Sequence, residues 1–171
     1  MKLSIFIILM FSISTAFAQQ KHKLTVDART GKPMLMGEVN RKAFQDSSFA
    51  SWFNTQYKFY KPDAKTEEAL VPGLKDKKIE IVMGTWCSDS RREVPRVLKV
   101  LDEANFPDSS LEIITINRKI KSIDNKVDSL HIKRVPTIIV YENGKELGRI
   151  IESPIETLEK DLENIVGKQK K

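Results

Sequence analysis

The chain has 171 residues, with 29 lysines and arginines against 23 aspartates and glutamates, so its formal net charge is +6. That length suits one domain with its own hydrophobic core. Positive charge gathers at the two ends, as in Lys21, Lys23, Lys170 and Lys171, which predicts solvated termini rather than a nucleic-acid-binding surface.

The first 18 residues are typical of a secretory signal peptide. Lys2 precedes a mostly apolar run over Leu3–Phe17, and Ala16-Phe17-Ala18 has the small-x-small pattern of a cleavage site. The run is short for a membrane-spanning helix, so a retained anchor is the less favoured alternative. We expect a mature protein that is periplasmic or secreted and that has no stable membrane insertion.

An N-terminal extension with one helix is expected over 19–66, before a main domain over 67–171. Residues 21–36 are polar and contain Gly31 and Pro33, which predicts a loose stretch with at most a short strand near Leu24–Val26. Asn40–Tyr60 is interpreted as one helix, and 66–70 as one helical turn closed by Val71-Pro72-Gly73. The bulky residues of the long helix are expected to cover the domain's own core: Phe44, Phe49, Trp52, Phe53, Tyr57 and Tyr60.

The chain has a single cysteine, Cys87, at the junction of a predicted strand and a predicted helix. Ile79–Met83 is a short apolar run typical of a buried strand, Gly84 breaks it, and a helical pattern runs from after Cys87 to about Asn105. Free backbone N–H groups and the positive end of a helix dipole favour a thiolate at such a junction. An inert, buried cysteine is the alternative.

The remaining elements complete an alternating α/β order. A strand is predicted over Leu111–Ile116, a short helix over Ser122–Leu130, and two strands joined by a tight Asn143-Gly144 turn. A last helix is predicted from Ser153-Pro154, where a capping box is present, to about Val166. From Ile79 the predicted order is β-α-β-α-β-β-α around a central mixed sheet.

The segment Gly84-Thr85-Trp86-Cys87-x-x-x-Arg91-Arg92-Glu93-x-Pro95 resembles the active-site segment of the thioredoxin superfamily, especially its secreted TlpA/ResA-like branch. The resemblance covers roughly 67–166 and implies a thioredoxin-like fold. Members of that branch usually carry Cys-x-x-Cys. Here the second position is Ser90, so the motif is Cys-x-x-Ser.

The resemblance implies roles for three residues. The Cys87 thiolate would attack a disulfide and form a mixed disulfide. Ser90 cannot resolve that intermediate, so an external thiol is needed, although its hydroxyl could donate a hydrogen bond to the thiolate. Glu93 matches a glutamate that assists proton transfer in that branch, and a solvated helix glutamate is the alternative.

Two further segments are expected to receive the substrate. Val135-Pro136-Thr137 resembles the family loop whose cis-proline lies beside the cysteine, which makes Val135 and Pro136 contacts for an extended substrate. Trp86 matches a tryptophan that forms the surface around the sulfur, with plain core packing as its alternative.

We therefore expect single-cysteine thiol–disulfide exchange through Cys87, on protein disulfides or small-thiol adducts. A redox-silent thioredoxin-fold module that binds proteins is the alternative. A monomer is expected, and a Cys87-linked dimer is a third, weaker hypothesis. Neither His22 nor His131 has a second ligand type near it in sequence, so no metal site and no cofactor is predicted.

Overall fold

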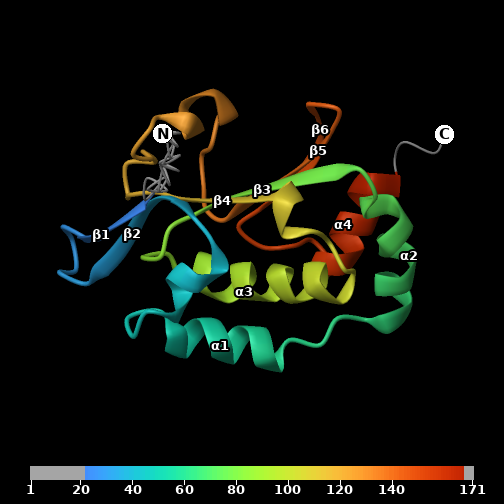
Figure 1. Ribbon diagram of the computed structural model, residues 1–171, viewed down its shortest axis with the longest axis horizontal. Helices are drawn as coiled ribbons and strands as arrows, with labels where there is room; N and C mark the ends of the chain where they lie inside the picture. The colour runs from blue at the N-terminus through green and yellow to red at the C-terminus, as the bar shows by residue number, and fades with distance from the viewer. Residues whose placement is uncertain (1–21, 168–171) are drawn as a thin grey trace, which may run out of the picture.

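A computed structural model describes residues 22–167 of the chain, and the expected signal peptide over 1–18 lies outside them. The described chain forms one six-stranded sheet with strand order β1-β2-β4-β3-β5-β6 and four α-helices (Figure 1). The strands are β1 (His22–Val26), β2 (Pro33–Val39), β3 (Lys77–Met83), β4 (Leu111–Thr115), β5 (Thr137–Glu142) and β6 (Lys145–Ile151). The helices are α1 (Ala50–Phe59), α2 (Ala64–Leu74), α3 (Ser88–Glu103) and α4 (Leu158–Gly167).

The sheet is mixed. Its two central strands, β3 and β4, are parallel, and every other neighbouring pair is antiparallel. The α3 crossover between β3 and β4 is what makes a parallel pair available. The predicted α/β fold with a central mixed sheet is confirmed.

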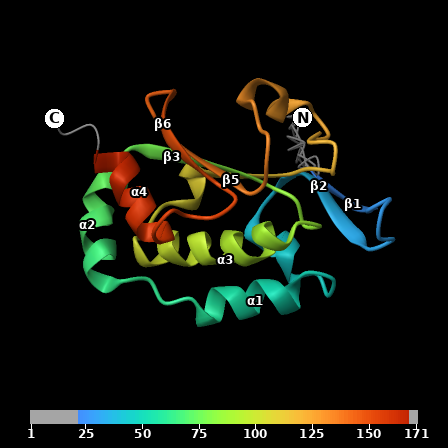
Figure 2. The same cartoon turned by 180° about the vertical axis from the view of Figure 1, so that it is seen from behind.

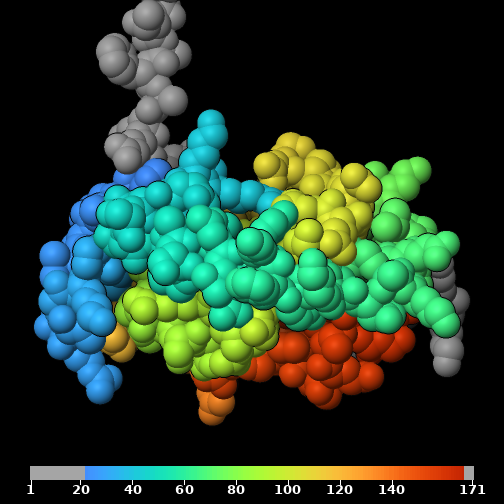
Figure 3. All heavy atoms as spheres, turned by 90° about the horizontal axis from the view of Figure 1, so that it is seen from below, coloured from blue at the N-terminus to red at the C-terminus, as the bar shows by residue number. Residues whose placement is uncertain are grey.

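The helices and the long loop lie on opposite faces of the sheet. α3 lies beneath the sheet with α1 outside it, while the segment after β4 lies on the other face (Figures 1 and 2). Side chains that alternate along the strands serve both faces: Ile79 and Ile81 belong to the larger core with the helices, and Val82 to a smaller core with Val127 and other loop residues. The space-filling view shows α1 lying over part of α3 (Figure 3).

The prediction of a loose N-terminal stretch is wrong. Residues 22–39 form the β1–β2 hairpin, and β2 pairs with β4, which joins the hairpin to the central sheet. The physical reason is apolar burial, because Met34, Leu35 and Met36 are each less than a tenth exposed. Gly31 occupies the hairpin loop with a φ of 69°, a conformation that favours glycine.

The single helix predicted over Asn40–Tyr60 is two pieces. A 3₁₀ helix covers Arg41–Gln45, and α1 begins only at Ala50. Asp46 separates them, since its backbone is extended at a ψ of 142° and its carboxylate accepts a hydrogen bond from Ser48 N–H at 2.8 Å. The aromatic residues cover the domain's own core as predicted: Phe44, Phe49 and Phe53 are buried, and Trp52, Tyr57 and Tyr60 pack against them.

The second α-helix, α2, is longer than predicted. α2 passes through Pro72 and Gly73 to Leu74, instead of one turn that Val71-Pro72-Gly73 closes. Asp63 caps it by accepting from Thr66 N–H at 2.9 Å. Gly73 is required by packing, because a Cβ there would lie 2.4 Å from Val166 Cγ2 of α4.

Two other helix predictions need correction. Ser122–Leu130 holds only a 3₁₀ helix over Lys126–Leu130, because Asn125 has a left-handed φ of 58° and the Asp124 carboxylate binds Lys126 N–H. α4 begins at Leu158 rather than at Ser153-Pro154. The Asp161 carboxylate accepts from the N–H groups at 155 and 156, so that segment forms a turn ahead of the helix.

The local signals at the middle of the chain are confirmed. β3 ends at Met83, α3 covers Ser88–Glu103, and β5 and β6 meet at Asn143-Gly144, where both φ angles are positive as a type I′ turn requires. No helix within 22–167 is long and apolar enough to cross a membrane.

Candidate functional site

Cys87 lies at the first turn of α3, as the sequence indicates. Its backbone is extended, its N–H donates to Gly84 O at 2.9 Å, and its carbonyl accepts the first helical bond from Arg91 N–H at 3.1 Å. The side chain is half-buried and forms no disulfide. A sulfur at this position lies beside the unpaired N–H groups of a helix start and remains accessible to a partner.

The loop before β5 lies against the cysteine. The Cys87 thiol donates a hydrogen bond to the Val135 carbonyl, with a sulfur–oxygen distance of 3.2 Å. The Val135–Pro136 peptide bond is cis, and Val135 is buried. Antiparallel pairing of Val82 with Thr137 brings this loop to the end of β3, which is why residues 48 positions apart meet.

Trp86 is fixed on three sides. Its indole N–H donates to Ile116 O at 2.9 Å, and its ring lies against the Gly84 backbone, where a Cβ would come within 2.5 Å of Trp86 Cε2. The Arg118 guanidinium lies over the ring, 4.6 Å from its centroid. The indole is partly exposed, so it forms part of the surface beside Cys87.

Arg118 and Asp27 belong to this neighbourhood, and sequence reasoning missed both. The buried Asp27 carboxylate accepts two hydrogen bonds from Arg118, at 2.9 and 2.8 Å, and one from the Thr30 hydroxyl at 2.6 Å. The Arg118 contacts hold the pKa of Asp27 well below its usual range. The Asp27 carboxylate, and to a lesser extent the charge of Cys87, raise the pKa of Arg118. No local pattern could reveal a pair that lies 91 positions apart.

Ser90 and Glu93 contact groups other than the Cys87 thiol. Ser90 is fully buried, and its hydroxyl oxygen accepts from Gly84 N–H at 3.3 Å, which ties the Gly84–Cys87 turn to α3. Glu93 is 4% exposed and binds the Arg92 guanidinium at 2.5 Å, with Arg96 3.8 Å away. The hydrogen bond of the Cys87 side chain within 22–167 is with Val135 and with neither of them. Their expected roles at the thiol stay predictions.

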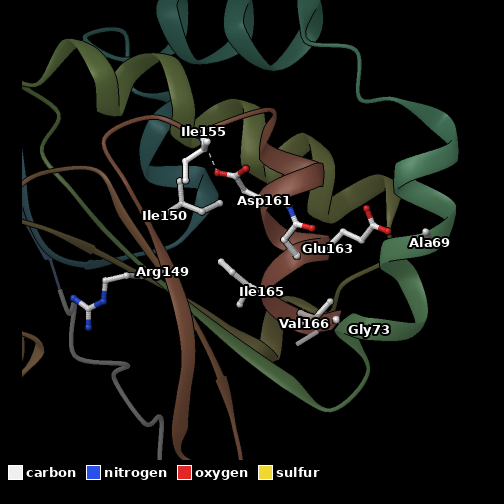
Figure 4. A pocket seen from close by; sticks show the side chains of 11 residues that line it. Ala69, Gly73, Arg149, Ile150, Ile155, Asp161, Glu163, Ile165 and Val166 are labelled. Atoms are coloured by element: carbon white, nitrogen blue, oxygen red, sulfur yellow. Dashed lines mark hydrogen bonds between the residues drawn. The ribbon is translucent and has the colours of Figure 1, made fainter. Parts of the chain in front are cut away.

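The structure thus brings together Trp86, Cys87 and the Val135–Pro136 loop. A hollow lies away from Cys87, between α2, β6 and α4. Gly73, Arg149, Ile155 and Asp161 are among the residues that line it (Figure 4). None of the predicted site residues lines it, and its Asp161 carboxylate is engaged by backbone N–H groups. Within residues 22–167, no cluster of three or more histidines, cysteines or acids could hold a metal ion.

Comparisons with known proteins give likeness in structure alone. No protein-family model matches the chain, and no curated protein matches its sequence. A solved protein of unknown function from Pseudomonas aeruginosa is similar over 75% of this chain and 89% of its own, with a TM-score of 0.52 and 15% identity. That likeness shows a shared fold.

Two thioredoxins are among the solved structures with lower scores. Thioredoxin O2 from Arabidopsis thaliana is similar over 63% of this chain and 89% of its own, at a TM-score of 0.39 and 17% identity. Mitochondrial thioredoxin 3 from Saccharomyces cerevisiae is similar over 56% of this chain and 86% of its own, at a TM-score of 0.34 and 16% identity.

Proposed function

We propose that this protein is an exported, thioredoxin-like protein of the TlpA/ResA-like kind that carries out thiol–disulfide exchange through a single cysteine, Cys87. One observation carries the proposal: a half-buried thiol at the start of α3 lies 3.2 Å from the carbonyl that precedes a cis-proline. The helix start supports a thiolate, and the neighbouring loop offers backbone groups to an extended substrate. Export rests on the signal-peptide pattern of the first 18 residues.

The proposed reaction has two thiol–disulfide exchange steps, which follow the ionisation of Cys87. The Cys87 thiol first loses its proton to solvent, which releases its hydrogen bond to Val135 O. The thiolate then attacks one sulfur of a disulfide, an S–S bond forms to Cys87, and the other sulfur leaves as a thiolate that takes up a proton. A second, external thiolate attacks the mixed disulfide and releases Cys87, because Ser90 has no sulfur with which to do so.

Substrate contact is proposed at the surface formed by Trp86 and the Val135–Pro136 loop. Trp86 is partly exposed and held in place by its bond to Ile116 O, so its exposed part offers a rigid apolar surface beside the sulfur. Protein disulfides and small-thiol adducts both suit such an open surface. A monomer is proposed, with a Cys87-linked dimer as the product of oxidation without substrate.

A redox-silent binding module remains the second candidate, and one observation favours it. The Val135 carbonyl accepts a hydrogen bond from the neutral thiol, and that bond is lost when the thiol ionises. In this candidate the same surface binds a partner protein without covalent chemistry.

An exchange assay separates the two candidates. Purified mature protein is mixed with a small disulfide and an external thiol, and the rate of exchange is compared with that of Cys87→Ser. Exchange activity that disappears in the variant supports the proposal. Activity of the variant equal to that of the unchanged protein overturns it, and so does an unchanged protein no faster than a protein-free control. Circular dichroism of both proteins checks that the fold is retained.

A further inference from the structure

A small hollow lies beside the candidate site, on the side of the N-terminal hairpin. Its volume is about 110 Å³, and four parts of the chain form it: the loop between β1 and β2, the turn before Cys87, the first turn of α3 and the segment after β4. The lining residues are Asp27, Thr30, Lys32, Pro33, Trp86, Arg91 and Arg118. The hairpin that sequence reasoning missed therefore supplies one wall of this hollow.

The hollow carries positive charge. Three of its side chains are cationic and one is a carboxylate, which leaves a net charge of two positive units. The carboxylate, Asp27, is already occupied by Arg118, Thr30 and the N–H of Arg29. Within the described chain, neither Lys32 nor Arg91 forms an ion pair with a carboxylate. Positive charge is thus left over for a ligand.

The two arginines of the hollow are held in place by contacts within the protein. Arg91 donates through Nε to Thr85 O at 2.5 Å, and its guanidinium lies 5.8 Å from the Trp52 ring centroid. Arg118 is fixed between Asp27 and the Trp86 ring. Because these side chains are already ordered, an anion that binds here costs little further conformational entropy.

The hollow is also close to the sulfur. Trp86 lines it and directly precedes Cys87, and consecutive Cα atoms lie about 3.8 Å apart. Arg91 follows Cys87 by one helical turn and donates its backbone N–H to the Cys87 carbonyl. Arg118, which also lines the hollow, lies close enough to Cys87 for a thiolate there to raise the pKa of Arg118. We take this closeness to extend to a group a few bonds away from a sulfur bound to Cys87.

We propose that this hollow, termed the arginine pocket (Lys32, Trp86, Arg91 and Arg118), binds a carboxylate of the substrate whose disulfide Cys87 attacks. The ligand class is a disulfide of a carboxylate-bearing thiol. The volume suits a small group rather than a whole ligand, because pockets for drug-sized molecules have about 300–1,000 Å³ and this hollow has about 110 Å³. Guanidinium and ammonium groups are the natural partners of a carboxylate. This inference rests on the proposed exchange at Cys87.

Two alkylating reagents of nearly equal size test the charge at the sulfur. Iodoacetate is an anion and iodoacetamide is neutral, and each transfers its carbon to the Cys87 thiolate with loss of iodide. The measured quantity is the iodoacetate rate divided by the iodoacetamide rate in the native protein, divided in turn by the same ratio in urea-unfolded protein. An exposed ion pair contributes up to about 1 kcal/mol, so a ratio raised about fivefold is expected. It should fall as salt is added.

Variants locate the effect. Lys32→Gln and Arg91→Gln should each lower the ratio toward one. Lys145→Gln makes the same change of charge at the first residue of β6, next to the end of β5 that is far from Pro136, and should leave the ratio unchanged. A ratio near one in the unchanged protein overturns the inference. An equal fall in all three variants also overturns it, because the effect would then come from net charge.

Two disulfides then test the ligand class directly. Dithiodipropionate carries carboxylates, and cystamine carries ammonium groups. Exchange several-fold faster with dithiodipropionate, lost in Lys32→Gln, supports the arginine pocket. Equal rates with both disulfides overturn the pocket and leave exchange at Cys87 standing. No exchange with either disulfide, in a protein that both reagents alkylate, overturns the proposed function instead.

A peptide arm separates two sources of the carboxylate. The same rates are measured with a disulfide-linked peptide that has an acidic residue next to its cysteine and with its amide counterpart. A preference seen only with dithiodipropionate assigns the pocket to small thiols. If the acidic peptide is preferred over its amide counterpart as strongly as dithiodipropionate is preferred over cystamine, the pocket is assigned to acidic protein segments. That result contradicts the small-thiol assignment that the pocket's volume favours.

Discussion

Glu67 is a buried carboxylate whose two oxygens have no hydrogen-bond partner within the described chain. It lies in the first turn of α2 and is 7% exposed. Burial, and then the charges of Glu103 and Glu159, raise its pKa from 4.5 to about 7. We predict that Glu67→Gln makes the free energy of unfolding less dependent on pH between about 4.5 and 7.

The direction follows from the raised pKa. The folded state holds the proton more tightly than the unfolded state, so Glu67 is not destabilising below about pH 4.5, and stability falls as pH rises from there to about pH 7. One pKa unit corresponds to about 1.36 kcal/mol, so the loss has an upper limit of about 3 kcal/mol. The N-terminal end of the α2 dipole favours the charged carboxylate and makes the true loss smaller.

Urea unfolding of the two proteins measures this difference. At about pH 8 the variant should be more stable than the unchanged protein by up to about 3 kcal/mol, and at about pH 4, below both pKa values, the two should be nearly equal. Glu68→Gln, which changes the exposed neighbouring carboxylate, is the matched control and should match the unchanged protein at both values. A Glu67→Gln protein whose stability changes with pH as steeply as that of the unchanged protein would refute the reasoning.

Three further substitutions test the site and the core. Gly84→Ala should displace the Trp86 ring, because the new Cβ would lie 2.5 Å from it; near-UV circular dichroism should change and exchange should slow, and an unaltered spectrum contradicts the packing. Leu101→Ala removes a fully buried side chain of α3 and should cost about 2–5 kcal/mol of unfolding free energy, while a loss under about 1 kcal/mol would mean that the core is looser than the structure shows. Ser90→Cys places a second thiol one helical turn after Cys87, so an internal disulfide should form and mixed disulfides should resolve without an external thiol. Intact mass after mild oxidation measures this as the loss of two hydrogens, and two free thiols would contradict it.

Local signals in the sequence were sufficient wherever a few adjacent residues decide the structure. The apolar run before Gly84 predicts β3, and the helical pattern after Cys87 predicts α3. Asn143-Gly144 predicts the hairpin turn, because both residues tolerate positive φ. The position of Cys87 between strand and helix follows from the same signals.

Predictions failed where distant residues override a local pattern. The capping box at Ser153-Pro154 is a true local signal, but Asp161 of α4 takes up the N–H groups that would have started the helix. The N-terminal hairpin depends on pairing with β4, about 80 positions away, and no local pattern reveals it. Pro72 and Gly73 suggest a stop, yet packing of α2 on α4 carries the helix past them.

The candidate site divides in the same way. Trp86, Cys87, Val135 and Pro136 could be named from sequence because each lies in a motif, and the Cys87–Val135 hydrogen bond brings them together. Asp27 lies in no motif, and its role depends on a long-range ion pair with Arg118. The arginine pocket was therefore beyond sequence reasoning, since its walls come from four separate segments.

The central claim is that Cys87 forms a mixed disulfide that the chain cannot resolve by itself. Its most direct test is the intact mass of the native protein after incubation with a small disulfide and removal of the excess. An adduct on Cys87 is expected, which persists until an external thiol is added and which Cys87→Ser does not form. An adduct that forms only in denaturant, or none at all, would contradict the account and leave the redox-silent binding module as the better description.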